Sequence, residues 1–253
     1  MILFCNGDSW TQGDRPAQKV NWNATNNLSW YDIPKYFGDY HKFTKSTVYK
    51  FYDSELWPKT LGRNLNFKTY NAGRNGDDNA GIVRRTINIL EKFKKQIPSN
   101  DISNFLVVIG WSSSLREDIF EKDENDKITL SQARPDDYYR KTLPSPVMYE
   151  DKFALNIYLL QSYLENNNIK FLFFNAFDRF EIEESNFRYL IKKQYWINSD
   201  THSAHFNDYI FEKFNLKNPE DSEYMAEGHP TDISHIAWGE FLTGYIKSNY
   251  ELN

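Results

Sequence analysis

A serine near the start of the chain and a histidine near its end have the chemistry of a nucleophile and its base. Ser9 ends the segment Gly7-Asp8-Ser9, which directly follows an apolar run over residues 2–5 that predicts a buried strand. A serine on such a turn presents its hydroxyl at the edge of a sheet, where backbone N–H groups can hold negative charge. His229 lies in a predicted loop before the last helix, and a neutral imidazole can take up a hydroxyl proton and return it. The pair therefore predicts nucleophilic catalysis, with Ser9 as nucleophile and His229 as general base.

Two further loops follow predicted strands and are expected beside that serine. Gly76 comes shortly after a predicted strand over residues 68–71, and Ser112 comes after one over residues 104–109. The carboxyl ends of parallel strands meet at one edge of a sheet, which is where such sheets bind ligands. We therefore expect Ser9, Gly76 and Ser112 to converge at that edge.

The order and spacing of these segments resemble the sequence blocks of the SGNH (GDSL-type) hydrolases over nearly the whole chain. Gly7-Asp8-Ser9 and His229-Pro230 resemble the first and last blocks, and segments 71–78 and 106–113 resemble the second and third. The resemblance implies a flavodoxin-like three-layer α/β/α sandwich with a parallel sheet. It also implies an esterase that uses neither a cofactor nor a metal. The oxyanion hole that it implies is formed by Ser9, Gly76 and Ser112.

The third block departs from the family pattern at two positions. Ser112 stands where the family has asparagine, and Ser113 stands where it has aspartate. Loss of a side-chain donor to an oxyanion typically lowers the rate by ~10²–10³. A serine hydroxyl, or a water that it holds, is expected to recover part of that loss.

The last block departs at the acid that orients the histidine. Ala226 occupies the family's acid position, three residues before His229. Glu227 is our first candidate to orient the imidazole instead, and Asp232 is the second. A backbone carbonyl could also hold the ring, which would leave a Ser-His dyad. His235, inside the start of the last helix, is expected to cap or to pack.

The substrate prediction rests on aromatic content and on a polar segment. Aromatic residues make up 17% of the chain, and many lie between residues 22 and 57, directly after the nucleophile. Most of these rings are expected to pack on the body, and a few to form a platform for sugar rings or an acyl group. Segment 116–150 is polar and predicts loops and a lid that suit a lipid tail poorly. We therefore expect a short acyl ester, such as an acetyl group on a carbohydrate. The residues expected to contact it are Asp8, Trp10, Arg74 and Trp111.

Strands alternate with helices along the chain, which predicts one domain over residues 1–253 with a parallel sheet. Insertions are expected at about 14–56, 116–150 and 181–224. An almost wholly apolar run predicts a further strand over 170–175. Helices are predicted over 56–65, 78–96 (capped by Asp77 or Asp78), 151–166 and from a Ser234 cap to near the end of the chain.

Composition excludes several partners. The net charge is −5 and no basic run is present, so no nucleic-acid partner is expected. Cys5 is the single cysteine, which rules out an internal disulfide and is compatible with a reducing compartment. Neither a signal peptide nor a membrane segment is expected from the sequence. The expected location is the cytoplasm or a larger assembly that carries the protein, and the oligomeric state is left open.

Two non-catalytic functions stay open at this point. The departures at Ser112 and Ala226 are compatible with a carbohydrate- or protein-binding relative that has lost turnover. A compact acidic chain is also compatible with a structural component of a larger assembly, such as a virus particle. Covalent labelling of a nucleophilic serine would separate the hydrolase from both.

Overall fold

The computed structural model describes the two ends of the chain and the elements between them, with gaps. The described residues are 1–8, 11, 55–74, 77–97, 99, 101–114, 117–122, 128–133, 146–177, 182, 184–197, 205–217, 224–226 and 229–251. Of the first expected insertion, only residues 55 and 56 are among them.

A four-stranded parallel sheet forms the centre of the molecule, with the order β2-β1-β3-β6. Its strands are β1 (Ile2–Asn6), β2 (Lys68–Asn71), β3 (Phe105–Trp111) and β6 (Lys170–Asn175). β3 is buried at every position, as a strand covered on both faces should be. Numbered along the chain, these four strands have the order 2-1-3-4, which is the order of the first four strands in flavodoxin-like sheets. The expected fold class is therefore confirmed.

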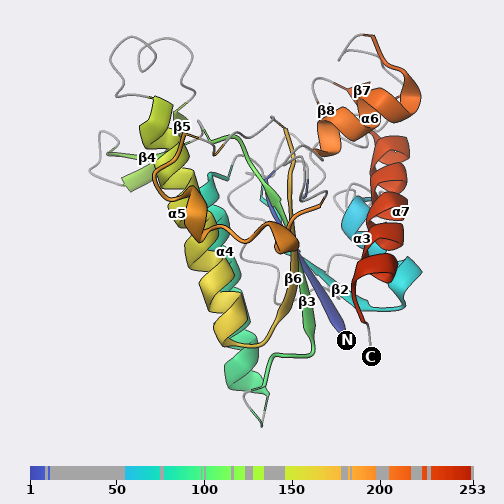
Figure 1. The fold of residues 1–253 in the computed structure, drawn as a ribbon, viewed down its shortest axis with the longest axis horizontal. Coiled ribbons are helices and arrows are strands. Elements are labelled where there is room, and N and C mark those ends of the chain that lie inside the picture. Colours follow the sequence, from blue (N-terminus) through green and yellow to red (C-terminus); the bar gives the residue numbers. More distant parts are fainter. Residues whose placement is uncertain are drawn as a thin grey trace.

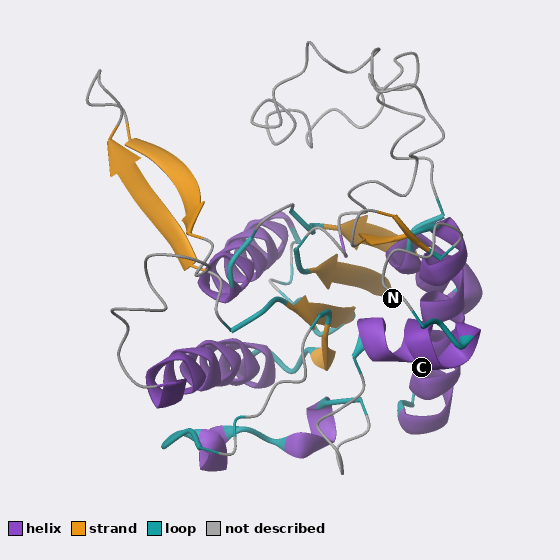
Figure 2. Ribbon diagram, turned by 90° about the horizontal axis from the view of Figure 1, so that it is seen from above, coloured by secondary structure: helices purple, strands orange, loops and turns teal. Residues whose placement is uncertain are grey.

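Helices cover both faces of this sheet and complete a three-layer sandwich (Figures 1 and 2). One face carries α4 (Asn79–Gln96) and α5 (Pro146–Asn166). The other carries α3 (Trp57–Leu65), α6 (Phe206–Phe214) and α7 (Asp232–Asn249). Side chains alternate across each strand, so the chain builds a separate apolar core on each side of the sheet.

Large aromatic side chains fill both cores. On the α3–α7 side, the ring of Phe174 lies edge-on to Trp57 at 5.4 Å and to Trp238 at 5.1 Å between centroids. On the α4–α5 side, the indole of Trp111 lies edge-on to Phe153 at 5.5 Å and is itself fully buried. Such edge-to-face contacts favour one arrangement of the rings and add to the stabilisation from burial.

The regular elements agree closely with the sequence prediction. β2 and β6 have the predicted bounds. Helix α3 has Pro58 in its first turn, where the backbone N–H that proline lacks is not needed for a helical hydrogen bond. Asp78 caps α4, because its carboxylate accepts the N–H of Gly81 at 2.5 Å. An apolar stripe and a correct cap define a helix from sequence alone.

The segments expected as insertions contain more structure than predicted. An antiparallel hairpin of β4 (Glu117–Lys122) and β5 (Ile128–Ala133) replaces the expected loops of 116–150 and extends away from the sheet (Figure 2). Helix α5 begins at Pro146 rather than at 151. Region 181–224 contributes α6 and two short 3₁₀ turns, Arg188–Leu190 and Lys193–Tyr195. The first turn of a helix tolerates proline, so Pro146 at the start of α5 was wrongly interpreted as part of a loop.

The start of the last helix also differs from the prediction. Helix α7 begins at Asp232 with Thr231 at its N-cap, and the hydroxyl of Ser234 donates to the carbonyl of Tyr224 at 2.7 Å. The predicted Ser234 cap is therefore wrong. Two short strands, β7 (Met225–Ala226) and β8 (His229–Pro230), pair just before this helix. His229 thus lies in a short strand instead of a free loop.

Close packing of α3 on α7 generates a stability prediction. A Cβ on Gly239 would lie 2.7 Å from Cβ of Thr60, whereas a Cβ on Gly244 of the same helix would meet nothing within 4 Å. We expect Gly239→Ala to lower the free energy of unfolding by about 1–3 kcal/mol through overpacking. Gly244→Ala should raise it by up to ~1 kcal/mol, because alanine favours a helix. Urea unfolding of both variants tests this, and equal effects would contradict the packing.

Candidate active site

The strand order places the topological switch point of the sheet between β1 and β3. From β1 the sheet grows to one side through β2 and to the other through β3 and β6, so this is the topological switch point where open α/β sheets bind ligands. Gly7 and Asp8 follow β1, and Ser112 follows β3. The two strand ends lie close together. A Cβ on Gly7 would be only 2.6 Å from the carbonyl oxygen of Gly110.

Four predicted site residues, namely Ser9, Trp10, Gly76 and Glu227, lie outside the described residues. Their roles therefore stay predictions. The described residues on either side of each gap show where the chain enters and leaves these segments.

Backbone contacts join the chain around Ser9 to the chain before Gly76. The N–H of Arg74 donates to the carbonyl of Gly7 at 3.0 Å. The side-chain amide of Asn71 donates to the carbonyl of Thr11 at 2.8 Å. The N–H of Thr11 in turn donates to the carbonyl of Asp8 at 3.1 Å. The structure thus brings the loops after β1 and β2 together, as the sequence predicted for the two segments.

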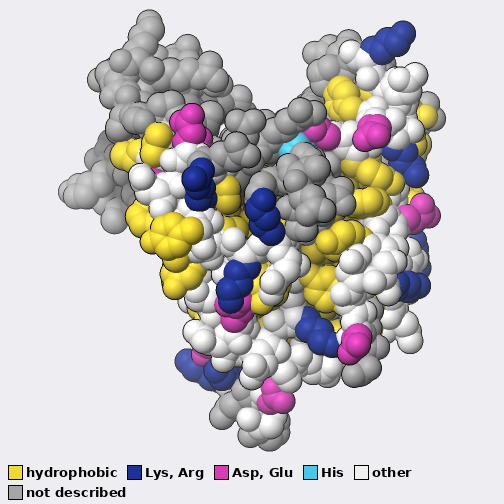
Figure 3. All heavy atoms as spheres, viewed as in Figure 1, with side chains coloured by type: hydrophobic (Ala, Val, Ile, Leu, Met, Phe, Trp, Pro, Cys, Tyr) yellow, Lys and Arg dark blue, Asp and Glu magenta, His cyan; other side chains and the backbone are white. Residues whose placement is uncertain are grey.

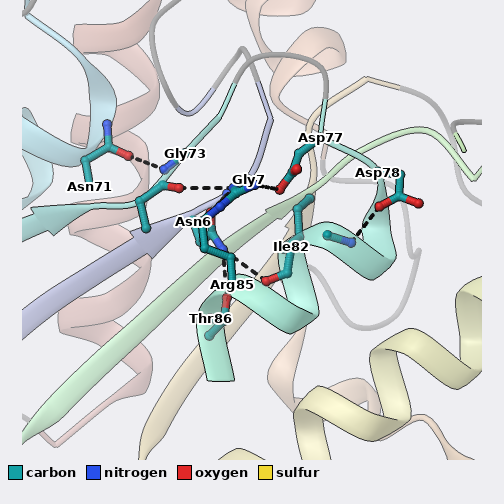
Figure 4. A network of polar contacts seen from close by, with 11 residues as sticks. Asn6, Gly7, Asn71, Gly73, Asp77, Asp78, Ile82, Arg85 and Thr86 are labelled. Atoms are coloured by element: carbon teal, nitrogen blue, oxygen red, sulfur yellow. Dashed lines mark hydrogen bonds and ion pairs between the residues drawn. The ribbon is translucent and has the colours of Figure 1, made fainter. Parts of the chain in front are cut away.

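An ion pair beneath these loops fixes their position (Figure 4). The guanidinium of Arg85 on α4 pairs with the carboxylate of Asp77, whose side chain is 1% exposed. The same guanidinium donates to the carbonyl of Ala72 at 3.3 Å and to the side-chain oxygen of Asn6 at 3.4 Å. One side chain therefore contacts the end of β1, the loop after β2 and the residue that follows Gly76.

Asn6, the last residue of β1, ties that strand to α4 (Figure 4). Its side-chain nitrogen donates to the carbonyl of Ile82 at 3.1 Å and to the hydroxyl of Thr86 at 2.8 Å. Its side-chain oxygen accepts the N–H of Gly7 at 2.9 Å. These bonds satisfy a fully buried amide, and they fix the backbone that leads into the Gly-Asp-Ser segment.

Ser112 is held from α4 as well. Its N–H donates to the side-chain oxygen of Asn79 at 2.9 Å, and the Asn79 nitrogen donates to the carbonyls of Ser112 at 3.1 Å and Ser113 at 3.2 Å. Ser112 is 4% exposed, and its hydroxyl has no hydrogen-bond partner in the part of the chain that the structure describes. A buried hydroxyl of this kind is one that a ligand or a water can satisfy.

His229 lies at the same end of the molecule as the carboxyl ends of the strands (Figure 1). β8 pairs with β7 through Ala226 opposite His229, and the imidazole is half-buried. A histidine side chain reaches the surface at this end of the molecule (Figure 3). An imidazole that water and substrate can reach suits a general base.

The second histidine of this region, His235, has a structural role. It is fully buried, and its Nδ1 accepts the backbone N–H of Trp57 at 3.4 Å. Burial, together with the nearby charge of His229, lowers the pKa of His235 to about 3. The ring is therefore neutral at neutral pH and packs at the junction of α3 and α7, as the sequence predicted.

Asp232, the second candidate for orienting His229, faces α3. Its carboxylate accepts the backbone N–H of Glu55. Burial raises the pKa of Asp232, while that hydrogen bond opposes the rise. The carboxylate is thus engaged by the segment that leads into α3.

The predicted substrate contacts have different environments. Arg74 is half-buried, and Asp8 is fully buried. Trp111 is also fully buried, with its ring against Phe153 and Phe173 in the α4–α5 core. Trp111 therefore contributes to packing, and its expected contact with substrate gains no support from this position.

Sequence reasoning missed Asn79 and Arg85. The signal was the run Asp77-Asp78-Asn79 at the start of a helix that needs only one cap. Asp78 is that cap, which leaves Asp77 and Asn79 for other partners. A single arginine on the inner face of an amphipathic helix was the second signal.

Within the described ranges, no group of three or more His, Cys, Asp or Glu side chains is arranged to hold a metal ion. None of the helices that the structure describes is long and apolar enough to cross a membrane.

The chain belongs to a family of unknown function, DUF6071, whose model matches residues 40–191. Among curated proteins, none matches the chain.

Three solved structures are similar to this chain at low sequence identity. The first is a candidate lipolytic protein of the G-D-S-L family from Desulfitobacterium hafniense DCB-2, with 13% identity, a TM-score of 0.43 and coverage of 96% of this chain and 97% of that one. The second is the psychrotrophic esterase EstA from Pseudoalteromonas sp., inhibited by monoethylphosphonate, with 13% identity, a TM-score of 0.43 and coverage of 98% and 99%. The third is a carbohydrate esterase with divergent catalytic and non-catalytic binding functions, with 9% identity, a TM-score of 0.44 and coverage of 99% and 65%. The fold assignment rests on the strand order and layers described above.

The buried ion pair predicts a large loss of stability when one partner is removed. Asp77→Ala leaves the guanidinium of Arg85, which is 19% exposed, without its carboxylate, and we expect a loss of about 3–5 kcal/mol. Replacing both partners by apolar residues, Asp77→Leu with Arg85→Met, should lose less, because no charge is left unpaired. Lys92→Ala, on the exposed side of α4, is the control and should change stability by less than about 0.5 kcal/mol. A double variant that is no more stable than Asp77→Ala would contradict this reading.

Buried His235 predicts a pH dependence of stability. The unfolded chain binds a proton at this residue below a pKa of ~6.5, whereas the folded chain does so only below about 3. The stabilisation is therefore complete above pH ~6.5 and is lost as the pH falls from there towards 3, by up to roughly 5 kcal/mol. His235→Asn keeps an acceptor near the position of Nδ1 and cannot be protonated. Its unfolding free energy should fall less steeply than that of the wild type between pH 6.5 and 4, and parallel curves would show that the residue does not titrate as proposed.

Proposed function

We propose that the protein is a serine hydrolase of the SGNH (GDSL) type that cleaves a carboxylic ester. The observation that supports this proposal is the close approach of Gly7 after β1, Arg74 after β2 and Gly110 near the end of β3 at the carboxyl edge of the sheet. The Gly-Asp-Ser segment leaves β1 and Ser112 leaves β3 on either side of the switch point. The chain that leads to Gly76 is bonded onto the first of these loops through Arg74 and Gly7.

In the proposed reaction, Ser9 Oγ attacks the acyl carbon while His229 takes the hydroxyl proton. The C–O bond to the alcohol then breaks, and His229 returns the proton to the departing alcohol oxygen. A water molecule, deprotonated by His229, then attacks the acyl carbon. The bond from this carbon to Ser9 Oγ breaks, and His229 returns the proton to Ser9 Oγ, which releases the acid and restores the serine. The negative charge on the carbonyl oxygen is held in both halves by the N–H groups of Ser9 and Gly76 and by the hydroxyl of Ser112.

Glu227 is the proposed partner of His229. The alternative, Asp232, accepts a hydrogen bond from the backbone of Glu55, while its Oδ1 has no partner among the described residues, so it stays the second candidate. A carboxylate next to the imidazole would fix its tautomer and stabilise the imidazolium that forms.

The proposed substrate is a short acyl ester, such as an acetyl group on a carbohydrate. Three features support it: the aromatic segment between residues 22 and 57, the polar segment 116–150 and the half-buried Arg74 in the loop after β2. An arginine can donate several hydrogen bonds to a hydroxylated or anionic substrate. Asp8 and Trp10 flank the nucleophile and are proposed to line the same site.

The second candidate function is a binding relative without turnover. It is favoured by the loss of two family side chains, at Ser112 and Ala226. The two candidates differ in whether Ser9 reacts, so an activity assay separates them.

Removal of Ser9 or His229 tests the hydrolase directly. We expect the wild type to cleave p-nitrophenyl acetate and acetylated sugars. Ser9→Ala and His229→Ala should each remove nearly all of that activity, because nucleophile and base act as a unit. Ser103→Ala, before β3 at the opposite end of the sheet, is the serine control and should retain it. A folded wild type that cleaves none of these esters would favour the binding relative.

A further inference from the structure

Helix α4 begins with three polar residues that have three different partners. Asp77 pairs with Arg85, and Asp78 caps the helix through the N–H of Gly81. Asn79 is left, and it contacts another part of the chain, 33 residues further on, at the end of β3. Its side chain is buried, with the residue 4% exposed.

The Asn79 amide acts on the backbone of Ser112 and Ser113 as a neighbouring strand would. It accepts the N–H of Ser112 at 2.9 Å and donates to the carbonyls of Ser112 at 3.1 Å and Ser113 at 3.2 Å. These bonds engage both the oxygen and the nitrogen of the amide with the backbone. Asn79 therefore fixes the end of β3 from the start of α4.

The same bonds determine what Ser112 can still do. Its N–H is taken up by Asn79, so the side-chain hydroxyl is the donor that remains. That hydroxyl is buried and has no partner among the described residues. A buried polar group without a partner is destabilising, and an acceptor oxygen of a ligand would remove that penalty.

We infer that Asn79 is a positioning residue that holds Ser112 so that its hydroxyl donates to the oxyanion. This inference rests on the proposed function and adds a residue that the family blocks do not supply. Serine is shorter than the asparagine it replaces, so its hydroxyl reaches the oxyanion only if its backbone is set accurately. A side chain on a rigid helix supplies that accuracy. Gly76, which carries another proposed donor, directly precedes Asp77 in the sequence.

A double-mutant cycle on kcat tests the inference. Ser112→Ala and Asn79→Ala should each lower kcat for p-nitrophenyl acetate by about tenfold to a hundredfold, the range expected for a weakened oxyanion donor. KM should change little, because the contact strengthens only in the transition state. In the Ser112→Ala background, Asn79→Ala should have less than about a twofold further effect, since residues that act through one another are non-additive.

Asn167→Ala is the matched control. This asparagine also uses both ends of its amide, with Lys94 at 2.7 Å and the carbonyl of Tyr163 at 2.8 Å, at the opposite end of the molecule. It should leave kcat unchanged in both backgrounds. If Asn79→Ala does not fold, Asn79→Asp replaces it in the cycle, because a carboxylate keeps the acceptor and loses the donors.

The outcomes separate this inference from the proposed function. Equal losses from Asn79→Ala with and without Ser112 would show a purely structural role and overturn the inference, as would an unchanged kcat. In either case an active wild type leaves the hydrolase proposal intact. A wild type without turnover overturns both.

Discussion

The carboxyl edge of this sheet depends on one buried ion pair. The carboxylate of Asp77 is almost fully removed from water and would be strongly destabilising without a counter-charge. Arg85 supplies it, and the planar guanidinium still has donors for Ala72 and Asn6. The end of β1, the loop after β2 and the start of α4 are thereby joined through a single side chain.

That arrangement explains why the site residues are held from α4. A strand ends where its ladder ends, so the backbone beyond it needs other partners. Asn6 supplies them for β1, and Asn79 supplies them for β3. Helix α4 thus supplies hydrogen-bond partners to the backbone where the strands of the sheet end. Loops held in this way keep their geometry without a ligand, which is what electrostatic preorganisation requires.

Much of the fold was predictable because its signals are local. Apolar runs defined β1 and β6, and a cap with an apolar stripe defined α4. The β4–β5 hairpin and α6 were missed, because short apolar patterns interrupted by charged residues resemble loops. Ser234 was misassigned as a cap, since the competing partner, the Tyr224 carbonyl, lies ten residues away. A partner at that separation leaves no periodic signal in the sequence.

For the candidate site, the sequence predicted where the strands end and did not predict the supporting contacts. Because parallel strands end at one edge of a sheet, the segments after β1, β2 and β3 were expected there. The bond between Asn79 and Ser112 could not be inferred, because it joins residues 33 positions apart through a side chain. Trp111 shows the converse. It is adjacent to Ser112 in the sequence, but its indole lies buried in the core on the α4–α5 side of the sheet.

Covalent labelling of Ser9 tests the central claim most directly. An alkyl fluorophosphonate would form a bond between phosphorus and Ser9 Oγ, with loss of fluoride and transfer of the hydroxyl proton to His229. Intact mass spectrometry should show one added phosphonyl group on the wild type, mapped to the peptide that contains Ser9. His229→Ala should react far more slowly, and Ser9→Ala not at all. A folded wild type that stays unlabelled, or that is labelled equally without His229, would contradict the account.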